Sequence, residues 1–398
     1  MNSSDNAPAG VFCPVCGSGE VREFVSLLDI PVYCNVLWPT REAAIDAARG
    51  DMRLGYCGDC THIFNTVFDP SLVTYAEDYE NSLHFSPRFR AYAEGLAKHL
   101  IDGHDLRGKV AVDIGCGRGD FLRLLCEMGD MQGMGLDPTL DGEIGSRTVV
   151  GPITFIKDHY SEKYSGLGAD LVCCRQVLEH LSAPRDMLVT VRRAVAGREK
   201  TTVFYEVPNA LFTLRDMGIW DLIYEHISYF TPASLTRAFE LSGFEICDLR
   251  EVYDGQYLSL EVSLASDGVP APEARPDPDG TADLVAGFAE EYSSRLKSWG
   301  GRLESMTRDG RKAVIWGAGS KGVSFLNALN AEQAVSGVVD ISPRKLGLHV
   351  AGTGHKVIAP ETIKEMRPDL IIIMNPIYKD EIEGTVREMG VGAEVVCV

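Results

Sequence analysis

Short apolar runs separated by polar turns recur along this chain of 398 residues. In the first clear unit, the run at 110–114 is followed by a loop with three alternating glycines and then by an apolar helical pattern at 121–125. A second short run ends in Asp137, and runs at 169–174 and 202–207 predict further buried strands. The alternation at 258–263 predicts a late antiparallel strand. Because strands alternate with helical patterns, the sequence predicts an α/β fold built on a doubly wound sheet.

A second unit of the same kind lies near the C-terminus. Residues 264–281 contain four prolines among small and acidic residues, which is typical of a linker, and a helix is expected at 282–306. A strand at 312–316 then leads into another glycine loop, which predicts a smaller, second Rossmann-like sheet. Later strands of this sheet are expected at 335–340 and 370–374. The predicted divisions of the chain are an N-terminal module at 1–75, a core at 76–265, a linker with a helix at 266–306, and a C-terminal domain at 307–398.

The polar residues of the first glycine loop indicate its ligand. Asp113 opens the loop, where its carboxylate would repel a phosphate but attract a ligand that carries an ammonium and a sulfonium. S-adenosylmethionine carries both charges, and its ribose hydroxyls suit Asp137, while the glycines allow the backbone to approach the ligand closely. A purely structural glycine turn is the alternative, but the two acids favour a cofactor, and the loop resembles that of the class I methyltransferases. The expected cofactor-binding residues are Asp113, Gly115, Gly117, Gly119, Asp137, Pro138, Asp158 and Gln176.

Net charge and the length of the apolar runs limit the kinds of partner that the protein is expected to bind. A formal net charge of −19 argues against nucleic acid, because phosphate backbones are bound by basic surfaces. No apolar run approaches the length of a membrane span, and the polar N-terminus does not resemble a signal peptide, so we expect a cytoplasmic protein with a small-molecule substrate. The oligomeric state is left open.

Four of the eleven cysteines form two C-x-x-C pairs, each with a neighbouring glycine. An odd number of cysteines without a secretory signal argues against a disulfide framework. Two such pairs can supply four thiolates in a tetrahedron, which predicts a structural zinc site; a redox pair and coincidence are the alternatives. The predicted ligands are Cys13, Cys16, Cys57 and Cys60. Cys116, Cys126, Cys173, Cys174, Cys247 and Cys397 lie in apolar surroundings and are expected in the core.

Two other segments carry candidate chemistry. The second glycine loop contains Lys321, which together with the backbone amides at a helix N-terminus favours a phosphate, although a structural turn is equally possible. After the strand at 202–207, the neighbours Tyr224, Glu225 and His226 bring together three groups that transfer protons. A histidine suits general base catalysis, and a histidine that only packs or caps is the alternative. His180 is expected to be structural or to lie on the cofactor side.

Taken in order, these blocks resemble the nucleotide-sugar C-methyltransferases of deoxysugar pathways. The features that carry the resemblance are the four-cysteine module, the sequence Glu-His-Ile-Ser-Tyr-Phe at 225–230, and a terminal domain with Gly-Ala-Gly-Ser-Lys-Gly at 317–322 and Asn-Pro-Ile-Tyr at 375–378. The resemblance implies that His226 removes a proton beside the ketone of a nucleotide-linked sugar and that the resulting carbanion takes the methyl group. It also implies substrate contacts from Tyr75, Tyr79, Lys321, Asn375 and Tyr378.

We therefore predict a zinc-containing, S-adenosylmethionine-dependent methyltransferase that acts at a carbon of a nucleotide-linked keto-sugar. Methyl transfer to oxygen or nitrogen of a related sugar or natural-product intermediate is one alternative, and a catalytically inactive assembly module is another. The sequence does not indicate the sugar, its nucleotide or the position methylated, nor which of Tyr224, Glu225 and His226 is the base.

Overall fold

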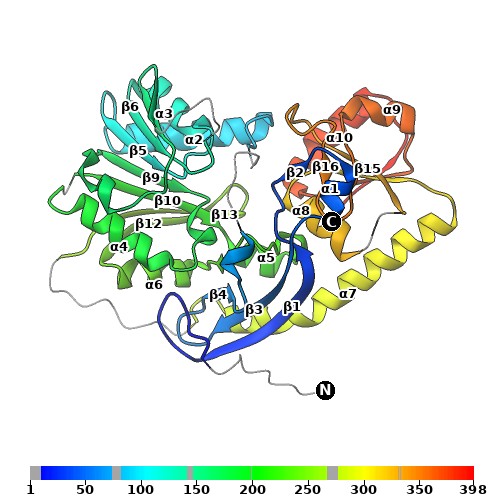
Figure 1. Ribbon diagram of the computed structural model, residues 1–398, viewed down its shortest axis with the longest axis horizontal. Helices are drawn as coiled ribbons and strands as arrows, with labels where there is room; N and C mark the ends of the chain where they lie inside the picture. The colour runs from blue at the N-terminus through cyan, green and yellow to red at the C-terminus, as the bar shows by residue number, and fades with distance from the viewer. Residues whose placement is uncertain are drawn as a thin grey trace.

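The computed structural model of the protein describes residues 10–73, 82–140, 147–198, 200–266, 277–329, 331 and 333–398 (Figure 1). Within these ranges the strands form three sheets and one two-stranded pair. The largest sheet has the order β12-β13-β10-β9-β5-β6-β8-β7. Its strands are β5 (Val110–Ile114), β6 (Gln132–Leu136), β7 (Arg147–Val150), β8 (Ile153–Ile156), β9 (Leu171–Arg175), β10 (Thr202–Pro208), β12 (Phe244–Val252) and β13 (Tyr257–Leu264).

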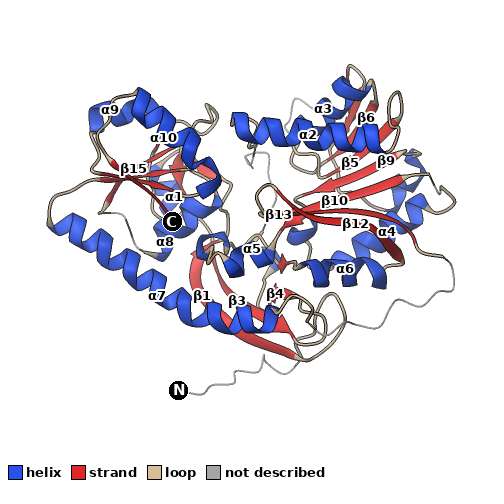
Figure 2. Cartoon of the chain, turned by 180° about the vertical axis from the view of Figure 1, so that it is seen from behind, coloured by secondary structure: helices blue, strands red, loops and turns tan. Residues whose placement is uncertain are grey.

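This sheet confirms the expected α/β class. Strands β10, β9, β5, β6 and β8 run parallel to one another, whereas β7 is antiparallel to β8, and β13 is antiparallel to both β10 and β12. Helices α2 (Pro87–Gly103) and α3 (Asp120–Gly129) cover one face, and α4 (Pro184–Val195) and α6 (Pro232–Leu241) cover the other (Figure 2). Side chains that alternate along the strands divide between these layers, since Ala111 packs with α2 and α3 whereas Val112 packs with α4 and α6.

The N-terminal sheet is completed by a strand from the middle of the chain. It has the order β1-β3-β4-β11, and β11 pairs with β4 through Tyr229 opposite Ile63. The strands are β1 (Val21–Pro31), β3 (Arg49–Cys57), β4 (Ile63–Asn65) and β11 (Ser228–Tyr229). The segment just after His226 is therefore held by the N-terminal module.

The C-terminal sheet is parallel throughout, with the order β17-β15-β14-β18-β19. Its strands are β14 (Ala313–Trp316), β15 (Val335–Val339), β17 (Val357–Ile358), β18 (Leu370–Ile373) and β19 (Glu394–Cys397). Its helices are α8 (Ser320–Ala328), α9 (Ile363–Met366) and α10 (Lys379–Glu388), and the long helix α7 (Thr281–Arg308) runs beneath it towards β1 (Figure 1).

One apolar core joins the three parts. It contains Leu27 of the N-terminal sheet, Trp220 and Ile223 of the segment before β11, Phe288 of α7 and Phe325 of α8. In addition, β2 (Leu37–Trp38) pairs antiparallel with β16 (His349–Val350), so that the N-terminal module also contacts the C-terminal domain. The remaining short helices are α1 (Arg41–Ile45) and α5 (Ala210–Arg215).

The structure corrects one expectation about the cysteines. Cys126, Cys173 and Cys174 are buried and Cys116 and Cys397 are half-buried, but Cys247 is exposed. Cys247 lies on β12, an edge strand of the central sheet, and its side chain faces outward where the register shifts between Ile246 and Asp248. No helix in the described part of the chain is both long and apolar enough to cross a bilayer.

Candidate active site

The first glycine loop borders a cavity of about 270 Å³ at the carboxyl ends of β5, β6 and β9. This is the edge where ligands of open α/β sheets bind. Of the eight residues expected to bind the cofactor, six line the cavity: Asp113, Gly115, Gly117, Asp137, Pro138 and Gln176. The arrangement therefore brings together residues from three successive strand ends.

The loop requires glycine at its first position. Gly115 has a φ of +70°, and a Cβ there would lie 2.2 Å from Cγ2 of Val177. At Gly117, with a φ of +53°, a Cβ would meet nothing within 4 Å, because the backbone there faces the open cavity. The loop backbone is therefore packed closely at Gly115 and open to the cavity at Gly117, so that a ligand can lie directly against it.

The two acids play different roles in the cavity. Asp137 shapes the loop, since its Oδ2 accepts a hydrogen bond of 2.8 Å from the Gly117 amide and its Oδ1 accepts one of 2.7 Å from the Thr139 amide. Asp113 is buried, and burial raises its pKa to about 7. A cationic ligand at this position would favour the ionised form of Asp113.

Two expected cofactor residues lie outside the cavity lining. Gly119 precedes α3, and a Cβ there would lie 2.5 Å from Cε1 of Phe155, so its role is to let the helix pack on the sheet. Asp158 instead forms an ion pair with Lys163 and accepts a hydrogen bond of 2.6 Å from Tyr164. The prediction that Gly119 and Asp158 bind the cofactor is therefore corrected, because neither residue lines the cavity.

A buried ionic network in the same cavity was not expected from the sequence. Arg175 lies 2.8 Å from Oε1 of Glu206, and Tyr92 donates a hydrogen bond to the same carboxylate. The Arg175 guanidinium also lies 4.2 Å from the ring centroid of Phe121. The only available signal was an acid inside the otherwise apolar strand at 202–207.

A second cavity, of about 310 Å³, adjoins the first and extends to the C-terminal glycine loop. We call it the acceptor cavity. Residues that line both cavities are Ser82, Leu83, Gln176, His180 and Tyr257. Together, the two adjoining cavities therefore extend from the first glycine loop to the second.

All three described candidates for substrate binding line this cavity. Lys321 lies in the first turn of α8 and forms an ion pair with Asp221. Asn375 exchanges hydrogen bonds of 2.9 and 3.0 Å with the amide of Gln256, which joins the C-terminal domain to the central sheet. The third candidate, Tyr378, accepts a hydrogen bond of 2.8 Å from Tyr253. Tyr75 and Tyr79 lie outside the described residues.

Of the three candidate catalytic residues, His226 alone lines the acceptor cavity. Burial lowers the pKa of His226 well below its usual value, so the imidazole is neutral at pH 7. The expectation that Tyr224 and Glu225 act beside it is corrected, because their side chains point elsewhere. The Tyr224 hydroxyl accepts a hydrogen bond of 3.0 Å from the Asp69 amide.

The Glu225 side chain holds the loop that contains Cys34 and Asn35. Its Oε2 accepts a hydrogen bond of 2.8 Å from the Cys34 amide, and burial raises its pKa to about 7. The next residue of that loop, Asn35, lines the acceptor cavity. Glu225 is therefore a positioning residue in this geometry, which sequence spacing alone could not indicate.

Two residues beside His226 were assigned little or no role from the sequence. Glu179 and His180 lie on the 3₁₀ helix Leu178–His180 after β9, and both line the acceptor cavity. Burial raises the pKa of Glu179 to about 8 and lowers that of His180 to about 4. The buried Glu179 and the half-buried His180 and His226 therefore form a compact group of proton-binding side chains in the cavity wall.

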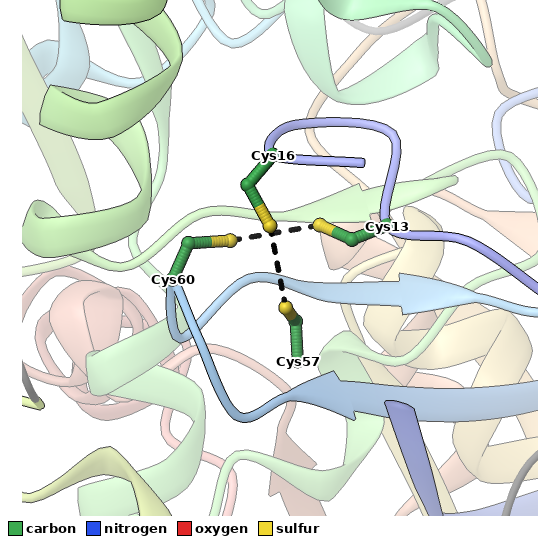
Figure 3. Close-up of side chains that lie close together, drawn as sticks. All are labelled: Cys13, Cys16, Cys57 and Cys60. Atoms are coloured by element: carbon green, nitrogen blue, oxygen red, sulfur yellow. Dashed lines mark hydrogen bonds between the residues drawn. The ribbon is translucent and has the colours of Figure 1, made fainter. Parts of the chain in front are cut away.

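The four expected metal ligands converge at the base of the N-terminal sheet (Figure 3). Sγ of Cys13 lies 3.5 Å from Sγ of Cys60, and Sγ of Cys16 lies 3.6 Å from Sγ of Cys57. These distances are too long for disulfides, which join sulfurs at about 2.05 Å. Sulfurs placed about 2.3 Å from one zinc ion would be separated by about 3.8 Å, so the cluster fits a tetrahedral ion.

Comparison with known proteins decides the family. A family described as a methyltransferase domain matches residues 85–249, and one described as the C-methyltransferase C-terminal domain matches residues 279–397. The chain is also similar to the C-methyltransferase NovU of Streptomyces niveus, with 26% identity over 296 residues, which are 69% of this chain and 68% of NovU. These matches identify the chain as an S-adenosylmethionine-dependent C-methyltransferase.

Two solved structures are similar to part of the chain. One is a magnesium protoporphyrin IX methyltransferase from Synechocystis, with 18% identity, 45% of this chain and 84% of that chain covered, and a TM-score of 0.34. Another is a 1,6-didemethyltoxoflavin N1-methyltransferase from Burkholderia thailandensis, with 17% identity, 52% and 97% covered, and a TM-score of 0.35.

The C-methyltransferase uses S-adenosylmethionine, and the cofactor cavity fits this molecule. The open side of Gly117 leaves room for the ligand, while Asp113 supplies a buried acid for its positive charges. When bound, S-adenosylmethionine supplies an electrophilic methyl group. The protein's own task is then to orient the acceptor and remove its proton.

Proposed function

We propose that the C-methyltransferase methylates a carbon next to the ketone of a nucleotide-linked sugar, with His226 as the base. The acceptor cavity carries this proposal, because it extends from His226 to the glycine loop of the C-terminal domain and shares a wall with the cofactor cavity. A substrate with a reactive sugar at one end and a phosphate group at the other has the extended form that this cavity would hold.

The nucleotide end would lie at the N-terminus of α8. Gly322 belongs to the first turn of this helix, and a Cβ there would lie 2.2 Å from the carbonyl oxygen of Gly317, so the loop is folded tightly against the helix. Backbone amides at a helix N-terminus bind phosphate, and Lys321 adds a positive charge beside them. Binding would require Lys321 to leave Asp221 for the phosphate.

The sugar end would lie against His226. A neutral imidazole has one nitrogen lone pair, which can accept the proton from the carbon beside the ketone. The electron pair of that C–H bond then delocalises onto the ketone oxygen as an enolate. S-adenosylmethionine, held by Asp113 and the loop at 115–117, would supply the methyl group that this carbon takes.

We also propose that the four-cysteine cluster holds a structural zinc ion. Four thiolates close the tetrahedron and leave no position for a substrate. The cluster joins the N-terminal residues 13–16 to the turn between β3 and β4. The ion would therefore stabilise the module that also positions β11, next to His226.

Hydrogen exchange tests the reaction without methyl transfer. Keto-sugar nucleotides are incubated with the enzyme in heavy water, with S-adenosylhomocysteine replacing the methyl donor. Deuterium is expected at the carbon beside the ketone, and His226→Ala should abolish its incorporation. Absence of exchange for every keto-sugar nucleotide, combined with methylation of a hydroxyl or amine, would overturn the proposal in favour of transfer to oxygen or nitrogen.

Nucleotide binding is tested separately by calorimetry with nucleoside diphosphates. Lys321→Gln should raise the dissociation constant about tenfold, because a charged hydrogen bond to phosphate contributes about 1.5 kcal/mol or more. The matched control is Lys379→Gln, at the exposed start of α10. An equal effect of the two substitutions would exclude the second glycine loop as the phosphate site.

A further inference from the structure

Three side chains of types that bind metals lie close together in the wall of the acceptor cavity, away from the four cysteines. Glu179 and His180 come from the turn after β9, and His226 comes from the segment before β11. One metal-binding atom from each of the three lies within 4.8 Å of the other two. The ring centroids of the two histidines are 4.9 Å apart, with an interplanar angle of 78°. Three donors are thus gathered from two separate segments of the chain.

The backbone holds these two segments together. The Ile227 amide donates a hydrogen bond of 2.8 Å to the Glu179 carbonyl oxygen. Nδ1 of His180 lies 2.9 Å from the Glu225 carbonyl oxygen, so it is the protonated nitrogen of the ring and donates this bond. Nε2 therefore carries the lone pair. Histidines that bind metals typically donate their other N–H to a carbonyl or carboxylate in this manner.

The carboxyl group of Glu179 supplies an independent observation. It is buried, with 1% of the residue exposed, and neither of its oxygens has a hydrogen-bond partner among the described residues. A buried carboxyl group normally has a partner, because loss of water otherwise disfavours it strongly. A cation between Glu179 and the two imidazoles would give both of these oxygens a partner.

We propose that Glu179, His180 and His226 form a second metal site, for a divalent transition ion of the zinc and cobalt class. Two imidazoles and one carboxylate suit such ions, whereas magnesium and calcium prefer oxygen ligands alone. All three residues line the acceptor cavity, so the remaining coordination positions face the substrate. The four-cysteine cluster differs, because its own thiolates complete the tetrahedron.

Occupation of this site changes what His226 can do. A neutral imidazole has one lone pair, so a nitrogen that binds a cation cannot also accept a proton. A bound ion and proton removal by His226 therefore exclude each other, and the ion acts as a reversible inhibitor of enolate formation. This consequence rests on the proposed function, whereas the metal site itself does not.

Cobalt binding to the zinc-loaded enzyme tests the site. Zinc is measured first, and Co²⁺ is then added while absorption and bound metal are followed. One further equivalent of Co²⁺ is expected, without the intense sulfur-to-metal charge-transfer absorption that thiolate ligands produce. Glu179→Gln and His180→Asn should each weaken binding by at least about tenfold, while His159→Gln, at an exposed histidine outside the group, should leave Co²⁺ binding unchanged.

Binding of Co²⁺ only at the cysteines, or a second equivalent that both variants retain with full affinity, would overturn the proposal. Two variants are used so that misfolding of one, detected by circular dichroism, leaves the other informative. Because one variant removes the carboxyl group and the other an imidazole, retention of Co²⁺ in either folded protein would also exclude that residue as a ligand.

Hydrogen exchange with and without Co²⁺ separates this proposal from the proposed function. Exchange is expected in enzyme treated with a weak chelator that leaves the cysteine-bound zinc in place, and Co²⁺ should abolish it. Glu179→Gln should require at least about tenfold more Co²⁺ for the same inhibition. Exchange that needs Co²⁺ would support the site and overturn both the inhibition and the role of His226 as base. Absence of exchange in both states, with Co²⁺ still bound, would overturn the proposed substrate and leave the metal site standing.

Discussion

Replacing Gly115 with alanine tests whether close packing against Val177 shapes the cofactor loop. The alanine would occupy a left-handed backbone conformation, with a φ of +70°, which costs about 1–2 kcal/mol in any non-glycine residue. Its Cβ would also lie 2.2 Å from Cγ2 and 3.4 Å from Cβ of Val177. Valine is stiff about χ1, so the clash moves the backbone and adds about 1–3 kcal/mol.

The expected total is a loss of about 2–5 kcal/mol in the free energy of unfolding, measured by urea denaturation. Val177 lines the cofactor cavity and follows Gln176, so the displaced backbone should also weaken binding of S-adenosylhomocysteine at least about tenfold, or about 1.4 kcal/mol, by calorimetry. The double variant Gly115→Ala with Val177→Ala removes the clash and keeps the strain. It should recover part of both losses.

Gly151→Ala is the matched control for backbone strain. Gly151 has a φ of +58°, but a Cβ there would meet nothing within 4 Å. The control should lose about 1–2 kcal/mol of stability and no cofactor affinity. Equal stability losses at positions 115 and 151, with unchanged affinity in both variants, would refute the packing argument.

Three other outcomes are expected. His226→Ala should abolish turnover with unchanged affinity for S-adenosylhomocysteine, whereas Asp137→Ala should weaken that affinity first. Affinity is measured by calorimetry and turnover by an activity assay. Equal losses of both properties in both variants would contradict the assignment of the two cavities. Cys57→Ser should lower the zinc content and the thermal midpoint, and Cys247→Ser, at an exposed cysteine, should change neither; zinc retained by the first variant would exclude the cluster as a metal site. Hydrogen bonds from two histidines lower the pKa of Glu261 to about 2 from 4.5, so this carboxylate stabilises the fold above pH 4.5 and the contribution is lost as the pH falls towards 2. Glu261→Gln should therefore lower stability at pH 6 and reduce the difference between pH 6 and pH 3 in urea unfolding; an unchanged difference would contradict this linkage.

The cofactor edge could be predicted because its geometry is local. The strand at 110–114, the loop after it and Asp137 belong to one strand–loop–helix–strand unit, and the structure brings Asp113, Gly115, Gly117 and Asp137 to one cavity. The helix at 281–308 and the parallel C-terminal strands follow the same reasoning, since their hydrophobic periodicity is evident within each segment.

The acceptor edge could not be predicted in the same way. Tyr224, Glu225 and His226 are neighbours in sequence, but their directions depend on Asp69 and Cys34, which belong to the N-terminal module. No local pattern indicates those partners. The same limit applies to Glu179, because its importance follows from its distance to a histidine that lies far along the chain.

The strand β11 has a consequence for how such enzymes could be divided or recombined. Tyr229 lies within the stretch matched by the methyltransferase-domain family, yet it pairs with the N-terminal sheet, and Trp220 and Ile223 pack into the core shared with the C-terminal domain. A fragment cut at residues 85–249 would expose these apolar side chains to water and leave His226 without its supports. Chimeras between relatives should therefore exchange the segment at 219–230 together with the N-terminal module. The part of the chain that determines acceptor specificity then does not coincide with the methyltransferase-domain match at 85–249.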